Sequence, residues 1–248
     1  LLYNYIGVDT MQRYFTNKIN DKFITLSGED TYHITKVMRM GINDKVEVVY
    51  DQKLLISRII ELEPLVKVEI LEEVVEDKTL SYDITIVQSL VKEQKMDYIL
   101  QKLTELGVSK IIPYTASRSI IKLDKKEDKK ILRWQTIVKE ASEQSKRNNI
   151  PVVENVINLS NLVKLSDYDI KILCTVNETS QNLKKVLSNI LHGAKILFVI
   201  GPEGGFTKEE EQEFISHGFI STSLGNSVLR TETASVFIMS VIRYLDME

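Results

Sequence analysis

The sequence predicts an α/β protein with two parts, a small N-terminal β-barrel followed by a larger domain built on a parallel sheet. Up to about residue 75, short runs rich in valine and isoleucine alternate in part with polar residues, which is typical of strands. From residue 83 onward, strand-like runs alternate with helical patterns, which favours a parallel sheet covered on both faces. The length of 248 residues is sufficient for both parts.

The N-terminal part carries three strand signals and one helix signal. Met11 has the features of a natural start, so residues 1–10 are interpreted as a leader or tag without a role. Strands are expected at 45–51, 54–62 and 66–75, and a short helix at 31–40, where Ile34, Val37 and Met38 follow helical spacing. A polar, acidic stretch follows. We therefore expect a β-barrel over residues 11–77 and a second domain over 78–248.

The C-terminal part alternates strands and helices along the chain. Strands are expected at 83–90, 110–115, 169–176, 195–201 and 221–225, and helices at 93–108, 131–145, 180–191, 208–218 and 233–245. The helix at 93–108 shows the pattern clearly, because its apolar residues recur on one face and Gly107 follows at a typical C-terminal position. This alternation predicts that the strand ends gather at one edge of the sheet.

Composition excludes several classes of function. Cys174 is the only cysteine, which excludes an internal disulfide and a CxxC zinc or redox site and fits a reducing cytoplasm. No apolar run approaches the roughly 18–20 residues of a membrane helix. The net charge of −3 hides a basic segment at 92–148, with fourteen lysines and arginines against eight acidic residues. Such a segment can bind a polyphosphate such as RNA, and a solvated surface is the alternative interpretation.

A glycine-rich turn is the most informative short motif. Five of the ten glycines fall between residues 201 and 225, and "GPEGGF" directly follows an apolar strand. Thr207 and Glu210 then form a T-x-x-E capping box that starts a helix. Ligands of open α/β sheets bind beside such strand-to-helix turns. The alternative is a tight turn that needs positive φ at Gly204 or Gly205. Neither GxGxxG nor GxxxxGK[ST] is present.

A second turn, in "SLGNSVLRTETAS", strengthens the ligand-site interpretation. It places Gly225 just after a short strand, and Arg230 and Glu232 before the last helix. Two glycine turns at the ends of two parallel strands predict one pocket with backbone and aliphatic walls, one arginine and one or two carboxylates. These walls suit an adenine and a small zwitterion better than a triphosphate. The alternative for Arg230 is an ion pair with Glu232 at the start of the helix.

Seven motifs in a fixed order carry a resemblance to a known family. They are "MQRYF", His33 with "KVMRM", "KEQKMDYILQKLTELGV", "PYTASRS", "RW" with "EASEQSKR" and "IP", "IGPEGGFTKEE", and "SLGNSVLRTETAS". Together they resemble the bacterial 16S ribosomal RNA uridine-N3 methyltransferases of the SPOUT superfamily. The resemblance covers the chain from Met11 onward. It implies a PUA-like β-barrel, a C-terminal domain with a deep trefoil knot, and a homodimer that acts on 16S rRNA of the small ribosomal subunit.

The resemblance also implies that S-adenosyl-L-methionine is the cofactor and that it binds in the loops of the knot. The cofactor-binding positions that match are Leu173, Thr175, Ile200, Gly201, Pro202, Glu203, Gly204, Gly205, Leu224, Gly225, Asn226, Val228 and Leu229. No metal is expected, because methyl transfer from a sulfonium needs only an in-line approach of the nucleophile.

The expected chemistry assigns roles to three charged residues. Uridine N3 carries a proton at neutral pH, so the site must remove it and stabilise the resulting anion. Arg230 is the candidate for stabilising the anion, and Glu203 and Glu232 are the candidates for accepting the proton. Expected phosphate contacts are Arg13, Lys36, Arg39, Lys92, Lys95, Arg118 and Arg147. Two alternatives stay open: a ribose 2′-O-methyltransferase of the same knotted class, and a non-catalytic rRNA-binding assembly factor.

Overall fold

The structure, a computed structural model, describes residues 11–75, 79–119, 121, 127–188 and 190–247. The predicted leader at residues 1–10 lies outside the described residues. The chain divides into two compact units. The first consists of Leu1–Lys78 with Ser142–Asn149, and the second of Thr79–Ala141 with Ile150–Glu248.

The first unit is built on one curled, mixed sheet. Its strands are β1 (Arg13–Phe15), β2 (Phe23–Thr25), β3 (Lys45–Tyr50), β4 (Lys53–Glu61) and β5 (Lys67–Val74), in the order β1-β3-β4-β5-β2. β1 pairs with β3 in parallel, and the other pairs are antiparallel. The three predicted strands are confirmed. The predicted barrel takes the form of a half-barrel, because β1 and β2 stand at opposite edges of the sheet in the described part of this unit.

The predicted helix near residue 34 is confirmed with one correction. α1 (Gly28–Tyr32) begins earlier than expected, because Ser27 accepts a hydrogen bond from the backbone N–H of Asp30 and caps it. A π-helical turn, η1 (His33–Val37), continues it. Of the three apolar residues at helical spacing, only Ile34 is buried, whereas Val37 and Met38 are 56% and 39% exposed. The π-helical turn changes the helical period, so the three side chains do not share one buried face.

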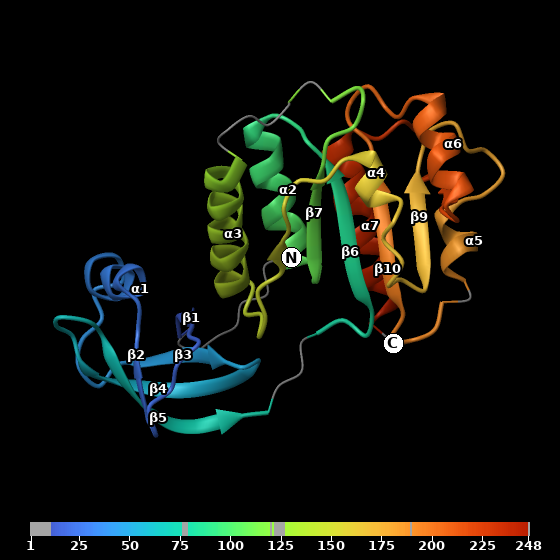
Figure 1. Cartoon of the computed structure of the whole chain (residues 1–248). Helices are drawn as coiled ribbons and strands as arrows, with labels where there is room; N and C mark the ends of the chain where they lie inside the picture. The colour runs from blue at the N-terminus through green and yellow to red at the C-terminus, as the bar shows by residue number, and fades with distance from the viewer. Residues whose placement is uncertain (1–10, 76–78, 120, 122–126, 189, 248) are drawn as a thin grey trace. The chain divides into compact units, whose positions relative to one another are not determined.

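The second unit is a parallel six-stranded sheet (Figure 1). Its strands are β6 (Asp83–Ser89), β7 (Lys110–Tyr114), β8 (Val152–Val153), β9 (Ile170–Cys174), β10 (Lys195–Ile200) and β11 (Ile220–Thr222). Their order is β11-β9-β10-β6-β7-β8, and every neighbouring pair is parallel. β9 is therefore flanked by β10 and β11, so the two glycine turns follow strands on either side of it.

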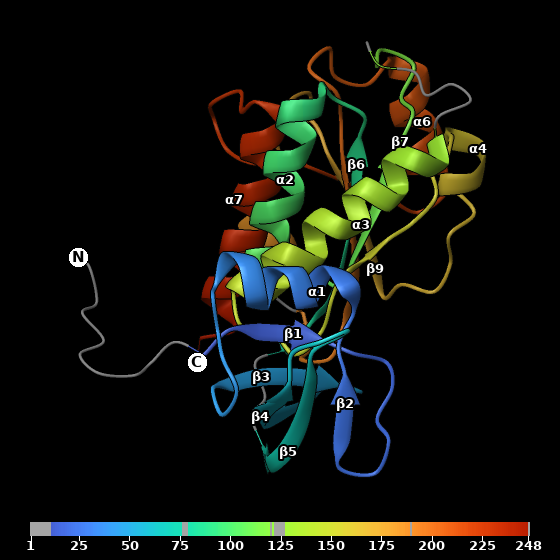
Figure 2. The same ribbon diagram turned by 90° about the vertical axis from the view of Figure 1, so that its left-hand side faces the viewer.

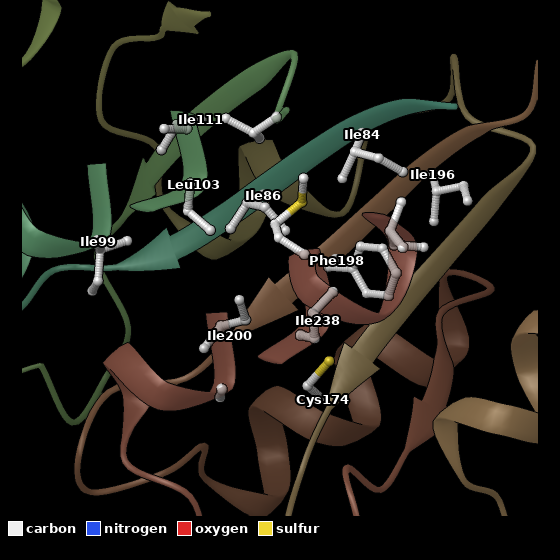
Figure 3. Close-up of a cluster of buried hydrophobic side chains, with 14 of the residues drawn as sticks. Ile84, Ile86, Ile99, Leu103, Ile111, Cys174, Ile196, Phe198, Ile200 and Ile238 are labelled. Atoms are coloured by element: carbon white, nitrogen blue, oxygen red, sulfur yellow. The ribbon is translucent and has the colours of Figure 1, made fainter. Parts of the chain in front are cut away.

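Helices cover both faces of this sheet, as the alternation predicted. The helices are α2 (Glu93–Glu105), α3 (Glu127–Gln144), α4 (Leu159–Leu162), α5 (Leu183–Leu187), α6 (Lys208–Ser216) and α7 (Thr231–Leu245). In β10, Ile196, Phe198 and Ile200 pack toward α2, α3, α5 and α7. Leu197 and Val199 pack on the opposite face, toward α4 and α6. Figure 2 shows α2, α3 and α7 in front of the sheet. Figure 3 shows side chains of the core on this face, among them Phe198, Ile200 and Ile238.

Local signals explain two helix ends. Gly107 has φ +102°, and a Cβ there would lie 2.8 Å from the Leu80 side chain, so glycine is required after α2. α5 is shorter than the predicted helix at 180–191. The residues before Leu183 instead form a loop, in which Glu178 accepts hydrogen bonds from Ser180 and from the backbone N–H of Gln181. Asn182 then caps the helix.

Candidate active site

The two glycine turns line one cavity of about 450 Å³, as the sequence predicted. We call residues 201–206 the β10 turn and residues 223–230 the β11 turn, after the strands that they follow. Residues 174–177, which follow β9, complete the lining. Of the predicted cofactor-binding positions, all but Leu173 line the cavity. Leu173 is fully buried and packs in the core on the α4 and α6 side, so its side chain points away from the cavity.

Packing fixes the glycines of the β10 turn. A Cβ on Gly201 would lie 3.0 Å from the Phe206 ring, and one on Gly204 would lie 3.3 Å from Cβ of Arg118. Gly205 has φ +66°, as the alternative interpretation of a tight turn requires, so the turn is tight and also lines the cavity. The backbone N–H of Gly205 donates to the carbonyl of Pro202 at 2.9 Å. The turn therefore has a defined shape without a ligand.

Side chains from two other elements brace the same turn. Arg118 donates to the carbonyl oxygens of Gly204 and Phe206, at 3.0 and 3.2 Å. Thr231, the first residue of α7, donates its hydroxyl to the carbonyl of Gly201 at 2.8 Å. The β10 turn is thus tied both to the loop after β7 and to the start of α7.

A buried glutamate anchors the helix that follows the turn. The capping box between Thr207 and Glu210 is confirmed. The Glu210 carboxylate also accepts hydrogen bonds from the Tyr114 hydroxyl and the backbone N–H of Ser117, both at 2.9 Å. Burial, and then the nearby charge of Glu210, raise the pKa of Tyr114, so its hydroxyl stays a donor. The loop that carries Arg118 is therefore fixed to the start of α6.

A buried glutamine, which the sequence analysis missed, connects α7 to the sheet. The Gln88 amide group donates to the Thr231 hydroxyl at 3.0 Å and to the carbonyl of Ser89 at 3.0 Å. Its carbonyl oxygen accepts a hydrogen bond from the Ser235 hydroxyl. Gln88, Thr231 and Ser235 are at most 5% exposed. The signal was a single amide inside the apolar strand "DITIVQSL", since a buried polar group requires partners.

The β11 turn is more exposed than the β10 turn. Gly225 has φ +124°, and no atom lies within 4 Å of a Cβ built on it. The Ser223 hydroxyl bonds to the backbone N–H and carbonyl of Gly225, at 3.2 and 3.1 Å. The side chains of Asn226 and Ser227 make no hydrogen bond within the described residues, and Val228 is 80% exposed. This turn presents backbone and aliphatic surface to the cavity.

The loop after β9 is held by α6. Glu211 accepts hydrogen bonds from the Thr175 hydroxyl and, at 2.9 Å, from the Asn177 amide group. Hydrogen bonds from Ser180, together with the backbone N–H of Gln181, lower the pKa of Glu178 to about 2. Thr175, a predicted cofactor contact, lines the cavity, and its hydroxyl is already bonded to Glu211.

Arg230 lies at the cavity wall as the residue that precedes α7. It is exposed, and its guanidinium makes no ion pair or hydrogen bond within the part of the chain that the structure describes. The alternative interpretation, an ion pair with Glu232, is absent from these residues. Glu232 instead faces Lys95, with 3.3 Å between Oε2 and Nζ. The Arg230 guanidinium is thus available to a ligand.

Glu203 and Glu232 share one cation. The Lys95 ammonium donates to Oε1 of Glu203 at 3.0 Å and forms the ion pair with Glu232. Burial acts to raise the pKa of Glu203, but the hydrogen bond from Lys95 and nearby positive charge outweigh it, and the pKa lies below its usual value. The hydrogen bond to Glu203 and the charge of Glu232 raise the pKa of Lys95 against a smaller effect of desolvation. Glu203 and Lys95 are therefore both charged at neutral pH.

Cys174 lines the cavity but is not a nucleophile. Burial raises the pKa of its thiol to about 12, so it stays protonated at neutral pH. No group of three or more potential metal ligands occurs among the described residues. The same residues include no helix long and apolar enough to cross a membrane.

Comparison with known proteins gives the family of this chain. The family model of an RNA methyltransferase domain matches residues 78–243. Ribosomal RNA small subunit methyltransferase E of Bacillus subtilis is 34% identical, over 94% of this chain and 96% of its own. The chain belongs to the ribosomal RNA small subunit methyltransferase E family. The Neisseria gonorrhoeae member, crystallised with bound S-adenosyl methionine, superposes with a TM-score of 0.85 at 32% identity, over 95% of this chain and 98% of that one.

Within this methyltransferase family member, the predicted phosphate contacts fall into two groups. Lys36, Arg39 and Lys92 are exposed. Arg13 is 3% exposed, and its guanidinium donates to Glu47, to the Lys146 carbonyl at 2.6 Å and to the Asn148 amide oxygen at 2.7 Å. Arg147 is 8% exposed and donates to the Asn149 side chain.

The positions of Arg13 and Arg147 correct the sequence-based interpretation, and Arg118 and Lys95, which stay exposed or partly exposed, have protein partners in addition to the predicted role. Arg13 and Arg147 are buried and bonded within the first unit, so their guanidinium groups hold that unit together. Arg118 braces the β10 turn, and Lys95 pairs with two carboxylates. The sequence shows only that a residue is a lysine or an arginine. It does not show whether that cation bonds to carbonyl oxygens of the protein or to phosphate groups of RNA.

Proposed function

We propose that this protein is an S-adenosyl-L-methionine-dependent methyltransferase that methylates N3 of one uridine in 16S rRNA of the small ribosomal subunit. Membership of the family supports the reaction class and the rRNA substrate. The observation that carries the assignment to this site is that both glycine turns line one cavity with Arg230 at its wall. We infer a cytoplasmic reaction, because the proposed substrate is ribosomal RNA.

The cavity fits the proposed cofactor in size and chemistry. Its volume of about 450 Å³ lies within the range of roughly 300–1,000 Å³ that is usual for small-molecule sites. Ile200, Leu224 and Leu229 offer aliphatic surface for a flat adenine ring. Gly225 lies beside open space, where any side chain would be strained and would narrow the cavity. The Neisseria gonorrhoeae relative was crystallised with this cofactor, which supports the assignment.

Arg230 is proposed to stabilise charge on the base. When bound, S-adenosyl-L-methionine supplies an electrophilic methyl group. Loss of the N3 proton spreads negative charge onto the neighbouring carbonyl oxygens of uracil, and an unpaired guanidinium beside them stabilises that charge. Because N3 lies on the Watson–Crick edge, the target uridine must be unpaired or flipped out of its helix.

Glu232 is the better of the two proposed proton acceptors. A lowered pKa makes Glu203 a weak base, and its carboxylate already accepts a hydrogen bond from Lys95. Glu232 lies in the first turn of α7, directly after the cavity-lining residues Arg230 and Thr231, and its contact with Lys95, at 3.3 Å, is longer than that of Glu203, at 3.0 Å. We therefore assign Glu203 to the cavity wall and Glu232 to proton acceptance.

The family resemblance also leads us to propose further features of the fold and of its assembly. We infer a trefoil knot in the C-terminal domain, a PUA-like N-terminal domain and a homodimer. Phe237 and Tyr244 of α7 are 39% and 74% exposed, and such aromatic residues are enriched at interfaces. Lys36, Arg39 and Lys92 are the remaining proposed phosphate contacts.

One experiment tests the reaction. The protein is incubated with methyl-labelled cofactor and with small subunits from a strain that lacks the enzyme, and the digested rRNA is analysed by mass spectrometry. We expect one labelled uracil base, methylated at N3. A label on ribose would favour a 2′-O-methyltransferase. Absence of both transfer and cofactor binding would favour a non-catalytic assembly factor.

A further inference from the structure

Three separate segments meet at the Lys95 ammonium. Lys95 lies in the first turn of α2, Glu203 in the β10 turn and Glu232 in the first turn of α7. The ammonium lies 3.0 Å from Oε1 of Glu203 and 3.3 Å from Oε2 of Glu232. The side chains of Lys95, Glu203 and Glu232 are 31%, 33% and 17% exposed, so water screens this cluster only in part.

One cation between two carboxylates has a clear electrostatic consequence. Without Lys95, Glu203, which lines the cavity, and Glu232, which lies beside it at the start of α7, would be left as like charges with no cation between them. Like charges repel at this range, and the repulsion would push the β10 turn away from α7. With Lys95 in place, both carboxylates are attracted to the same point.

From this geometry we propose that Lys95 is a positioning residue that clamps the β10 turn to the start of α7. The inference rests on the proposed function, because it assigns these two elements to the cofactor cavity. Glu203 lines the cavity, and Glu232 belongs to the helix turn that Arg230 precedes. Lys95 therefore acts on the cofactor and the base through these residues, and it is not a phosphate contact.

Lys92 is a matched control on the same helix end. It immediately precedes α2 and is exposed, and it makes no ion pair within the described residues. Its charge suits the phosphate contact that we assign to it. The two lysines thus separate the clamp role from the RNA-contact role at neighbouring positions.

The test compares Lys95→Gln with Lys92→Gln in the full-length protein. We expect Lys95→Gln to weaken S-adenosyl-L-methionine binding in calorimetry about five-fold or more, the upper range for partly exposed ion pairs. It should leave the salt dependence of rRNA binding unchanged. Lys92→Gln should change cofactor binding much less than Lys95→Gln does, because Lys92 acts on Glu203 only as a nearby charge, and should reduce the slope of log K against log salt by roughly 0.7–0.9. Lys95→Arg should restore most of the cofactor affinity.

Removing the repulsion supplies a second, independent readout. In Lys95→Gln, the added changes Glu203→Gln and Glu232→Gln should recover part of the lost affinity, because the like charges are gone. The proposal is overturned if Lys95→Gln binds the cofactor as wild type does and lowers the salt slope, or if neutralising the carboxylates recovers nothing. If wild type binds no cofactor, the proposed function fails instead. The clamp is then judged by the same charge cycle in thermal unfolding, where additive effects would refute it.

Discussion

The β10 turn and the β11 turn reach the same cavity but are built differently. The β10 turn is bonded at three of its carbonyl groups, by Thr231 and Arg118, and Gly201 packs closely against the Phe206 ring. The β11 turn is held at its first residue, where the Ser223 backbone bonds to Gln181 and Leu183, but hydrogen bonds of residues 224–229 within the described part of the chain run only between Gly225 and Ser223, and Val228 is 80% exposed. One wall of the cavity is therefore preformed by the protein, and the other has few bonds to the remainder of the fold.

This difference suggests that the two walls have different roles in ligand binding. A preformed wall lowers the entropic cost of binding, because its shape does not change when the ligand arrives. An exposed wall can place its backbone and its arginine against ligands that enter from solvent. We expect changes in the β11 turn to affect catalysis most strongly, and changes around the β10 turn to affect stability and cofactor affinity.

The largest effect is expected at the exposed wall. Arg230→Ala removes the unpaired guanidinium and should lower kcat for rRNA methylation by roughly 100-fold or more, the loss seen when one group that stabilises a developing anion is deleted. Cofactor affinity and unfolding should stay close to wild type. Arg243→Ala, in the last turn of α7, is the control and should retain full activity. Equal activity of the two variants would exclude Arg230 from the reaction.

Loss of the buried network beside the β10 turn should lower the stability of the folded protein. Gln88→Leu removes one hydrogen-bond partner each from the Ser89 carbonyl and from the Thr231 and Ser235 hydroxyls, which keep their bonds to the carbonyls of Gly201 and Thr231, and should lower the free energy of unfolding by about 2–3 kcal/mol. Urea unfolding measures this change. Gln101→Leu, on the exposed side of α2, is the control and should change stability by less than about 0.5 kcal/mol. Equal stability of the two variants would contradict the role of the buried network.

The two turns also show what the sequence can and cannot predict. Both turns were located by glycine clusters after apolar strands, because backbone conformation leaves a local mark such as the positive φ of Gly205 and Gly225. Their bracing was not predicted. Arg118 and Lys95 were interpreted as phosphate contacts, since the partners that occupy them lie 86 and 108 or more residues away along the chain. The π-helical turn that leaves Val37 and Met38 exposed was likewise not predicted, because their spacing also fits an ordinary helix.

A smaller effect is expected when the preformed wall loses one brace. Arg118→Ala removes the hydrogen bonds to Gly204 and Phe206, and should weaken cofactor binding by roughly three- to ten-fold in calorimetry. Arg133→Ala provides a matched control, because Arg133 is bonded only to α2 carboxylates among the described residues. If Arg118→Ala instead changes only the salt slope of rRNA binding, Arg118 is a phosphate contact and not a brace.

The smallest effect is expected at the Cys174 thiol, which lines the cavity between the two turns. Folding raises the pKa of Cys174 from 9.0 to about 12, so this group contributes stability below about pH 9 that is lost as the pH rises toward 12. Cys174→Ala should lack this component in unfolding measured from pH 8 to 10.5. At pH 8, the native thiol should react with an aromatic disulfide reagent far more slowly than the urea-unfolded chain does. Rapid reaction of the native protein would mean that the thiol is exposed or ionised.

The central claim is that the two turns together enclose the methyl donor. A crystal structure of the protein with bound S-adenosyl-L-methionine tests it most directly. The account predicts a ligand whose adenine and methionine parts contact both residues 201–205 and residues 224–229, with its methyl group directed toward the Arg230 side of the cavity. A cofactor bound at another place, or contacted by only one of the two turns, would contradict it.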